Sequence, residues 1–346
     1  MLYDTKNPHG GDIYAGDIRL DFSANINPLG TPESVREAIG NALSRVDRYP
    51  DPYCRALRTA IAKAEGVPED YVICGSGASE LIYTFADAFR PSSAAELAPT
   101  FSEYSRSVAR LGCGMACYAL SEEKGFAPDA GVLDFLRETR PAVFFLCNPN
   151  NPTGRLADPR LLEQILALCD EQGTFVFVDE CFLDLTDGVS LKPYLAKYPQ
   201  LFLLKAFTKS YGMAGVRLGY GLCADADMLR DMAAAAPPWN VSSLAQAAGV
   251  AALGETEFLE KTRTIVKTER AWLTGALGAL GYRVIASDAN YLLFRAAPGL
   301  SDALREKGVL IRSCDNYEGL SSGWYRVAVR THTENEALIQ TIREIE

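Results

Sequence analysis

A lysine and an arginine lie close together in the sequence where the chain leaves an apolar run. Lys209 follows the run 201–204, which we interpret as a buried strand, and Arg217 comes eight residues after Lys209. Burying an ammonium group costs free energy and lowers its pKa, so a lysine in this position is most useful as a neutral amine. Such an amine forms a Schiff base with an aldehyde, and an arginine nearby suits a phosphate group on the same molecule. A lone lysine on a loop is more often a plain surface residue, so the rest of the chain decides between these interpretations.

A glycine-rich turn is the second candidate. Residues 75–79, Gly-Ser-Gly-Ala-Ser, connect a predicted strand at 71–74 to a predicted helix at 81–89. Backbone N–H groups at the start of a helix have no partner within the helix and bind phosphate. Such turns are common, so the motif is weak by itself. It complements the phosphorylated aldehyde that Lys209 and Arg217 favour, which is pyridoxal phosphate.

Two more polar residues follow predicted strands. Asp179 ends the strand 174–178, and Asn151 lies in the turn after the strand 142–147. A carboxylate beside a pyridine nitrogen keeps the ring protonated, so that the ring can accept electrons. The amide of Asn151 could donate to the phenolic oxygen of the same ring, although Asp179 could equally be an exposed turn residue. Tyr104 could stack on the ring face, as aromatic pairs do, or belong to the core.

The segments that carry these residues alternate between strand and helix. Near-continuous apolar strands, separated by amphipathic helices such as 160–172, indicate a mostly parallel sheet covered by helices on both faces. Ligands bind at the carboxyl ends of the strands in such sheets, where all four motifs lie. After Pro238 the pattern changes to a helical region at 243–280, three further strands and a terminal helix. We therefore predict an α/β protein with a large domain at 45–236 and a smaller α+β domain formed by 1–44 and 237–346.

Composition limits the classes of function. The formal charge of −10 and the pI near 5.0 argue against a general binder of nucleic acid or of acidic membranes, because both require a basic face. No apolar stretch reaches the roughly 20 residues of a membrane span, and the N-terminus has no signal-peptide pattern. Nine cysteines are scattered without a CxxC pair, and there are only two histidines. We expect a cytoplasmic protein with reduced thiols and no metal site.

The motifs resemble a known family when they are taken in order. Asn-Pro-Thr-Gly at 151–154, Asp-Glu-Cys-Phe at 179–182, Thr-Lys at 208–209 and Gly-Val-Arg-Leu-Gly at 215–219 resemble the fold-type-I pyridoxal-phosphate enzymes of the aminotransferase superfamily. The resemblance implies the fold of aspartate aminotransferase. It also implies that Lys209 is the Schiff-base lysine rather than a surface residue.

The resemblance also assigns roles to the site residues. It implies that Lys209 moves the proton, that Asp179 pairs with the pyridine nitrogen and that Tyr104 stacks on the ring, which makes these three the catalytic residues. Asn151 would contact the phenolic oxygen. The cofactor phosphate would be held by a larger group: Gly77, Ala78, Ser79, Thr208 and Arg217. Tyr49, in Arg-Tyr-Pro-Asp, matches a tyrosine that reaches the phosphate from the neighbouring subunit, which implies a homodimer.

Within the superfamily the chain is most similar to the threonine-phosphate decarboxylases of cobalamin biosynthesis, and next to the histidinol-phosphate aminotransferases. The first similarity rests on His-Gly-Gly at 9–11 and on the segments 20–30, 311–317 and 325–330. It implies a small phosphorylated amino acid as substrate, with these residues around it: His9, Asn27, Asn151, Arg312, Arg326 and Arg330. Phe182 stands where the aminotransferases usually place a tyrosine, which favours the decarboxylase. The residues Gly-Met-Ala-Gly at 212–215 favour the aminotransferase, and Ala206 replaces a hydroxyl residue that often helps to hold the phosphate.

Overall fold

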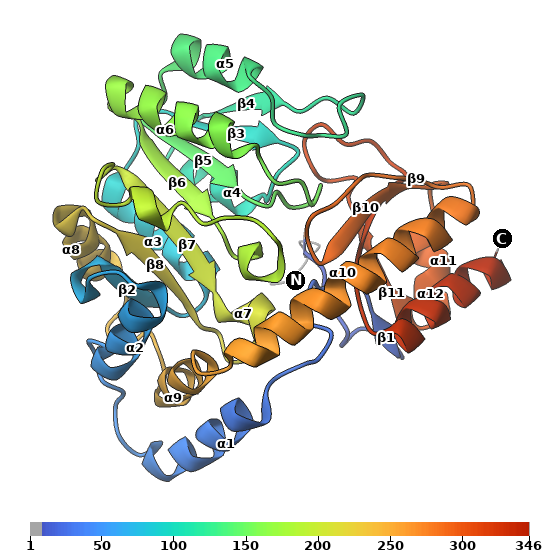
Figure 1. Cartoon of the computed structure of the whole chain (residues 1–346), viewed down its shortest axis with the longest axis horizontal. Helices are drawn as coiled ribbons and strands as arrows, with labels where there is room; N and C mark the ends of the chain where they lie inside the picture. Colours follow the sequence, from blue (N-terminus) through green and yellow to red (C-terminus); the bar gives the residue numbers. More distant parts are fainter. Residues whose placement is uncertain (1–8, 346) are drawn as a thin grey trace.

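A seven-stranded sheet forms the centre of the larger part of the molecule. The computed structural model describes residues 9–345. The strands have the order β2-β8-β7-β6-β5-β3-β4, and only β8 runs antiparallel to its neighbours (Figure 1). Their bounds are β2 (Val72–Gly75), β3 (Ala94–Ala98), β4 (Met115–Ala119), β5 (Val143–Cys147), β6 (Phe175–Asp179), β7 (Leu201–Ala206) and β8 (Gly219–Cys223).

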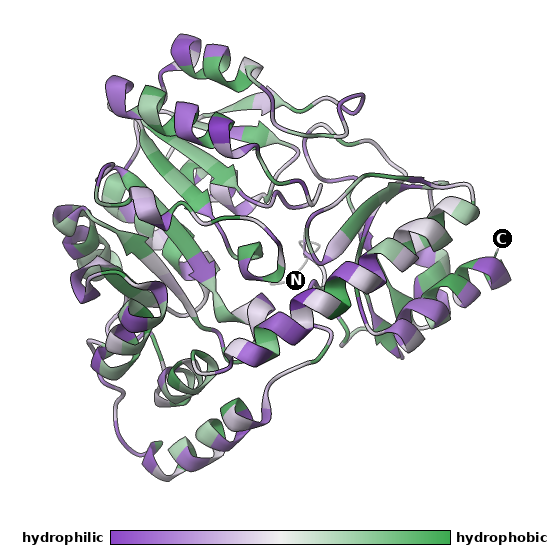
Figure 2. Ribbon diagram, in the orientation of Figure 1, coloured by the Kyte–Doolittle hydropathy of each residue, from purple (hydrophilic) through white to green (hydrophobic). Residues whose placement is uncertain are grey.

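The side chains of this sheet alternate between two cores because successive residues of a strand point to opposite faces. Phe144 of β5 and Val176 of β6 belong to one core, whereas Phe145 and Phe177 belong to the other. Both faces are therefore apolar, as the green strands of Figure 2 show. The first core is covered by α2 (Arg55–Glu65), α5 (Gly131–Thr139) and α6 (Pro159–Gln172), and the second by α3 (Ala78–Phe89), α4 (Glu103–Ala109) and α8 (Ala226–Ala235).

A smaller unit lies beside the large sheet. It contains an antiparallel sheet of order β12-β13-β10-β9 and a parallel pair, β1-β11, packed on three helices around a separate core. The strands are β1 (Leu20–Asp21), β9 (Arg283–Val284), β10 (Tyr291–Arg295), β11 (Val309–Leu310), β12 (Arg312–Ser313) and β13 (Trp324–Ala328), and the helices are α10 (Thr256–Ala279), α11 (Leu300–Glu306) and α12 (His332–Ile345). This architecture confirms the predicted fold class.

The predicted helical region at 243–280 is two helices, α9 (Ser243–Ala252) and α10, separated by a turn at 253–255. Helix α9 packs against α1 (Glu33–Ala42) and α2, whereas α10 runs from the large sheet to the small unit (Figure 1). The domain boundaries at 45 and 236 stay predictions. The remaining short elements are α7 (Phe207–Ser210), η1 (Leu43–Arg45), η2 (Glu69–Tyr71), η3 (Leu183–Leu185) and η4 (Lys192–Tyr194).

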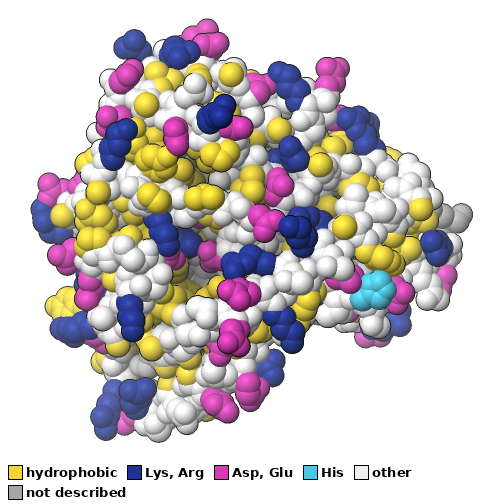
Figure 3. Space-filling view, in the orientation of Figure 1, with side chains coloured by type: hydrophobic (Ala, Val, Ile, Leu, Met, Phe, Trp, Pro, Cys, Tyr) yellow, Lys and Arg dark blue, Asp and Glu magenta, His cyan; other side chains and the backbone are white. Residues whose placement is uncertain are grey.

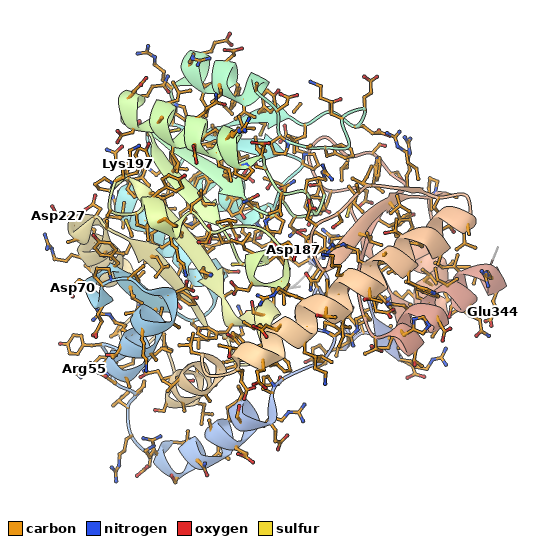
Figure 4. The ribbon with its side chains drawn as sticks, viewed as in Figure 1. Arg55, Asp70, Asp187, Lys197, Asp227 and Glu344 are labelled. Carbon is orange, nitrogen blue, oxygen red and sulfur yellow. The ribbon has the colours of Figure 1, made fainter. Side chains whose placement is uncertain are left out.

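Charged side chains of both signs are mixed over the face seen in Figure 3. The residues labelled in Figure 4 are all exposed: Arg55, Asp70, Asp187, Lys197, Asp227 and Glu344. Between residues 9 and 345 no helix is long and apolar enough to cross a membrane.

Candidate active site

A cavity of about 230 Å³ opens at the carboxyl ends of β5, β6 and β7. Its wall brings together residues from the four sequence motifs and from the small unit. The motifs were expected to meet here because they follow the carboxyl ends of strands in a mostly parallel sheet. The predicted residues that line it are His9, Ala78, Ser79, Asn151, Asp179, Thr208, Lys209, Arg217, Arg312 and Arg326.

Lys209 lies on α7, the single helical turn that follows β7. Its ammonium group is inside the cavity, 5.8 Å from the centre of the Phe182 ring. Burial lowers the pKa of Lys209 to about 8, and the charge of Arg326 adds to this effect. A substantial fraction of the amine is therefore neutral near physiological pH, which nucleophilic attack on an aldehyde requires.

Asp179 closes β6, lines the same cavity as Lys209 and is 6% exposed. Its carboxylate accepts hydrogen bonds from the hydroxyl of Tyr104, at 2.6 Å, and from the backbone N–H of Cys181, at 2.9 Å. Burial raises the pKa of Asp179, whereas these hydrogen bonds and the charge of Lys209 oppose the rise. A cation bound beside the carboxylate would stabilise its ionised form further.

The predicted stacking of Tyr104 on the cofactor needs correction. The Tyr104 ring is fully buried behind the cavity wall and stacks on Phe145, with 5.5 Å between ring centres. Phe101, three residues earlier, lines the cavity in its place. Tyr104 therefore acts on the site through Asp179. The sequence offered a signal for Phe101, because it is an aromatic residue in the same short segment as Tyr104.

Arg217 and the start of α3 form an anion cradle. Gly77 has a backbone φ of +89°, and a Cβ atom there would lie 2.6 Å from a guanidinium nitrogen of Arg217. Only glycine allows this approach, because it tolerates positive φ and has no side chain to collide with the arginine. Ala78 and Ser79 follow at the N-terminus of the helix, where backbone N–H groups and the helix dipole favour an anion.

Asn151 and Arg326 are joined across the two units. A terminal nitrogen of Arg326 donates to Oδ1 of Asn151 at 2.5 Å, and the other terminal nitrogen donates to the carbonyl of Ser23 at 2.7 Å. The Nε atom of Arg326 is buried without a partner among the described residues. Since Asn151 accepts through its oxygen, its NH₂ group stays available to donate to a ring oxygen.

Asn27 does not reach the cavity, and its predicted role in substrate binding is corrected. Its amide donates to the carbonyl of Ser210 at 2.7 Å and to the hydroxyl of Thr262 at 2.9 Å, which ties the N-terminal segment to the turn of Lys209. Asn25, two residues earlier, lines the cavity instead, and its Oδ1 atom is buried without a hydrogen-bond partner among residues 9–345. Both asparagines lie in the segment 20–30, and the sequence did not distinguish them.

Two other predicted residues lie outside the cavity. Arg330 follows β13, and its guanidinium is paired with Glu334 at 2.7 Å. A role in substrate binding would require it to leave Glu334. Tyr49 is 78% exposed and stacks on Trp239 of the same chain, with 4.6 Å between ring centres. The substrate-binding role of Arg330 and the role of Tyr49 at the neighbouring subunit's phosphate therefore stay predictions. Among the described residues no group of three or more His, Cys, Asp or Glu side chains could hold a metal.

Comparison with known proteins defines the class. A family model described as aminotransferase class I and II matches residues 17–342. The threonine-phosphate decarboxylase of Salmonella typhimurium is 36% identical over 98% of this chain and 97% of its own length. Histidinol-phosphate aminotransferase 1 of Cupriavidus pinatubonensis is 32% identical, covering 95% of this chain and 88% of the relative. The crystal structure of the histidinol-phosphate aminotransferase from Clostridium acetobutylicum has a TM-score of 0.88 at 27% identity, covering 94% of this chain and 99% of that chain.

The chain belongs to the class I and II aminotransferase family, whose members are fold-type-I enzymes that use pyridoxal 5′-phosphate. The described residues fit this cofactor. The cradle made by Gly77 and Arg217 suits its phosphate, Lys209 suits its aldehyde and Asp179 suits its ring nitrogen. The recognition of the family from its motifs is thereby confirmed.

Proposed function

We propose that this enzyme decarboxylates L-threonine O-3-phosphate, in the synthesis of the side-chain precursor of cobalamin. One structural observation carries the proposal. Arg312 of β12 and Arg326 of β13 lie directly opposite each other across the small sheet, and both line the cavity. Like charges in opposite positions destabilise a sheet. Two such arginines, in addition to the Arg217 that suits the cofactor phosphate, favour a substrate with two anionic groups.

Different residues of the cavity would bind the substrate, orient it and transfer the proton. When bound, pyridoxal phosphate draws electrons from the bond that breaks. Arg326 would hold the α-carboxylate of the substrate. The Oδ1 atom of Asn25, which has no hydrogen-bond partner among residues 9–345, would accept a hydrogen bond from the substrate's α-amino group. The orientation in which Arg326 would hold the substrate decides whether the bond to the carboxylate or the bond to the α-hydrogen is aligned for cleavage. Positioning of this kind determines whether the enzyme decarboxylates or transaminates. Lys209, in its ammonium form, would donate the proton that replaces the departing carboxylate on the α-carbon.

The substrate phosphate would lie toward the mouth of the cavity. His9 and Arg312 line both the cavity and a hollow of about 480 Å³ outside it. Arg312 is held by the side chain of Asn316 and lies 5.4 Å from the centre of the Tyr317 ring. The proposal includes Arg330 as a further phosphate ligand only after it leaves Glu334.

The second candidate is an aminotransferase that acts on histidinol phosphate or a related amino-acid phosphate with 2-oxoglutarate. The similarity to two enzymes of that name supports it. Phe182 argues for the decarboxylase: it lines the cavity beside Lys209, and its ring cannot donate a hydrogen bond to the phenolic oxygen.

The proposal extends to assembly and location. We propose a homodimer in the cytoplasm, in which Tyr49 of one subunit reaches the cofactor phosphate of the other. The exposure of Tyr49 and of the neighbouring Val46 and Tyr53 is consistent with a covered surface at this position.

The function is tested by supplying the purified enzyme, loaded with pyridoxal phosphate, with threonine phosphate and no oxo acid. The proposal predicts continued release of carbon dioxide and formation of aminopropanol phosphate. Activity on histidinol phosphate only in the presence of 2-oxoglutarate, without carbon dioxide, would establish the second candidate instead.

A further inference from the structure

The N-terminal arm is attached to the mouth of the cavity by a buried carboxylate. The Nε2 atom of His9 lies 2.7 Å from Oε1 of Glu103, the first residue of α4. His9 lines the cavity, whereas Glu103 is 7% exposed and stands behind the wall. The ring of His9 also contacts Phe101, with 5.5 Å between ring centres. The imidazole is therefore fixed from two sides by one segment of the large unit.

Glu103 is held in place independently of His9. The hydroxyl of Tyr83, on α3, donates to Oε2 of Glu103 at 2.7 Å, and Arg106 approaches Oε1 at 3.4 Å. Burial works to raise the pKa of Glu103, but the contacts with His9, Tyr83 and Arg106 outweigh it, so that the pKa is lowered. Glu103 is thus an ionised group with fixed geometry, and its carboxylate can accept a hydrogen bond from the imidazole of His9.

A second attachment fixes the backbone next to His9. The N–H of Gly11 donates to the hydroxyl of Ser23 at 2.7 Å. The Cα atom of Gly10 packs so closely on the backbone of Ser23 that a side chain at position 10 would collide with the Ser23 carbonyl. The same carbonyl accepts a hydrogen bond from Arg326. His9 and Arg326 are consequently linked through Ser23, and a shift of the arm would change both.

We infer that Glu103 is a positioning residue that holds His9 over the mouth of the cavity as a ligand for the substrate's distal anionic group. The inference rests on the proposed function, because it assigns that group to the outer end of the substrate. Glu103 does not contact the cavity itself, so it acts through His9.

The test compares Glu103→Gln with Asp87→Asn in the enzyme loaded with pyridoxal phosphate. Asp87 of α3 pairs with Arg110, the residue that follows α4, so its variant removes one negative charge near the same helix. Loss of a charge-assisted hydrogen bond predicts about a ten- to hundredfold weaker binding of inorganic phosphate by Glu103→Gln, measured by calorimetry. Asp87→Asn is expected to bind phosphate as the unsubstituted enzyme does.

Steady-state kinetics separate positioning from loss of structure. Glu103→Gln is expected to raise KM for threonine phosphate about tenfold or more and to change kcat about threefold or less, because Glu103 does not line the cavity where the reaction would take place. Binding of unphosphorylated L-threonine should stay unchanged. In a double-mutant cycle with His9→Gln, the two losses should not add, since both variants break one contact.

Three results would each overturn the inference. They are additive losses in the double-mutant cycle, an equal loss of affinity for threonine and threonine phosphate in Glu103→Gln, and unchanged binding of inorganic phosphate in that variant. If Glu103→Gln does not fold, Glu103→Asp, which withdraws the carboxylate from His9 while keeping its charge, must give the same loss of phosphate affinity. A wild-type enzyme that releases no carbon dioxide from threonine phosphate would refute the proposed function, whereas the phosphate titration would still decide the role of Glu103.

Discussion

The hydroxyl of Tyr104 donates a hydrogen bond of 2.6 Å to Oδ2 of Asp179, across 75 positions of sequence. Asp179 is the carboxylate that suits the ring nitrogen of the cofactor, and Tyr104 is fully buried behind it. The tyrosine thus fixes one oxygen of the carboxylate, and its hydrogen bond favours the ionised form of Asp179.

The first prediction concerns this pair. Tyr104→Phe should lower kcat about ten- to hundredfold, because a hydrogen bond to a charged group contributes about 1.5–3 kcal/mol. The cofactor should still bind, since Lys209 and Arg217 are unchanged, but its absorbance should titrate at a different pH. The matched control is Tyr291→Phe, which removes another buried hydroxyl, bonded at 2.9 Å to the carbonyl of Asn150. Equal effects of the two variants would contradict the role given to Tyr104.

The second prediction follows from the pKa of Lys209, which burial and Arg326 lower to about 8. The amine is protonated below this pKa and cannot attack an aldehyde, and it is neutral above it. The rate at which cofactor-free enzyme takes up pyridoxal phosphate should therefore rise with pH and level off above about pH 8. Stopped-flow absorbance measures this rate. A rate that keeps rising to the ordinary pKa of a lysine, near 10.5, would show that the amine is not perturbed.

The third prediction separates two asparagines of one segment. Asn27→Ala removes hydrogen bonds to Ser210 and Thr262 and should lower the free energy of unfolding by about 1–3 kcal/mol. Asn25→Ala removes an acceptor that has no partner within residues 9–345, so it should affect stability little and raise KM instead. Urea unfolding and steady-state kinetics on both variants test the pair. An increase in KM confined to Asn27→Ala would reverse the assignment.

The fourth prediction concerns Glu96, whose Oε2 atom is buried without a partner in the described part of the chain. Burial, with a smaller contribution from Glu318, raises the pKa of Glu96 from 4.5 to about 8. Between these values the folded protein retains a proton that the unfolded chain has released, so stability falls as the pH rises through this window.

Glu96→Gln removes this titration. The free energy of unfolding of the unsubstituted protein should fall by about 1–3 kcal/mol more than that of the variant between about pH 5 and pH 8. Glu318→Gln is the comparison variant, because Glu318 is exposed and its charge makes a smaller contribution than burial to the raised pKa of Glu96. Parallel pH profiles of the unsubstituted protein and Glu96→Gln would contradict the prediction.

The sequence predicted those parts of the fold whose local pattern agrees with their tertiary surroundings. Strands β5, β6 and β7 each contain a continuous apolar run, at 143–147, 175–178 and 201–204, so their placement and the polar residues that follow these runs were predictable from the pattern. Strands β3 and β8 were not predicted, because Ala-Ala-Glu-Leu-Ala and Gly-Tyr-Gly-Leu-Cys contain small residues that have low intrinsic preference for strands. Pairing with neighbouring strands determines their structure.

The site was predictable where a residue belongs to a motif with a chemical reason for its position. Lys209, Asp179, Asn151 and Arg217 all line the cavity. The direction in which a side chain points was less predictable. Phe101 and Tyr104 stand three positions apart, and Asn25 and Asn27 two positions apart, so the backbone path decides which member of each pair reaches the cavity. The partner of His9 on α4 is 94 positions away and gave no sequence signal.

Reduction of the cofactor-loaded enzyme with borohydride, followed by mass spectrometry of its peptides, tests the central claim most directly. The structure predicts one phosphopyridoxyl group per chain, attached to Lys209, and none in Lys209→Ala. Labelling of another lysine, such as Lys205 on β7, or an unmodified Lys209 would contradict the account of this site.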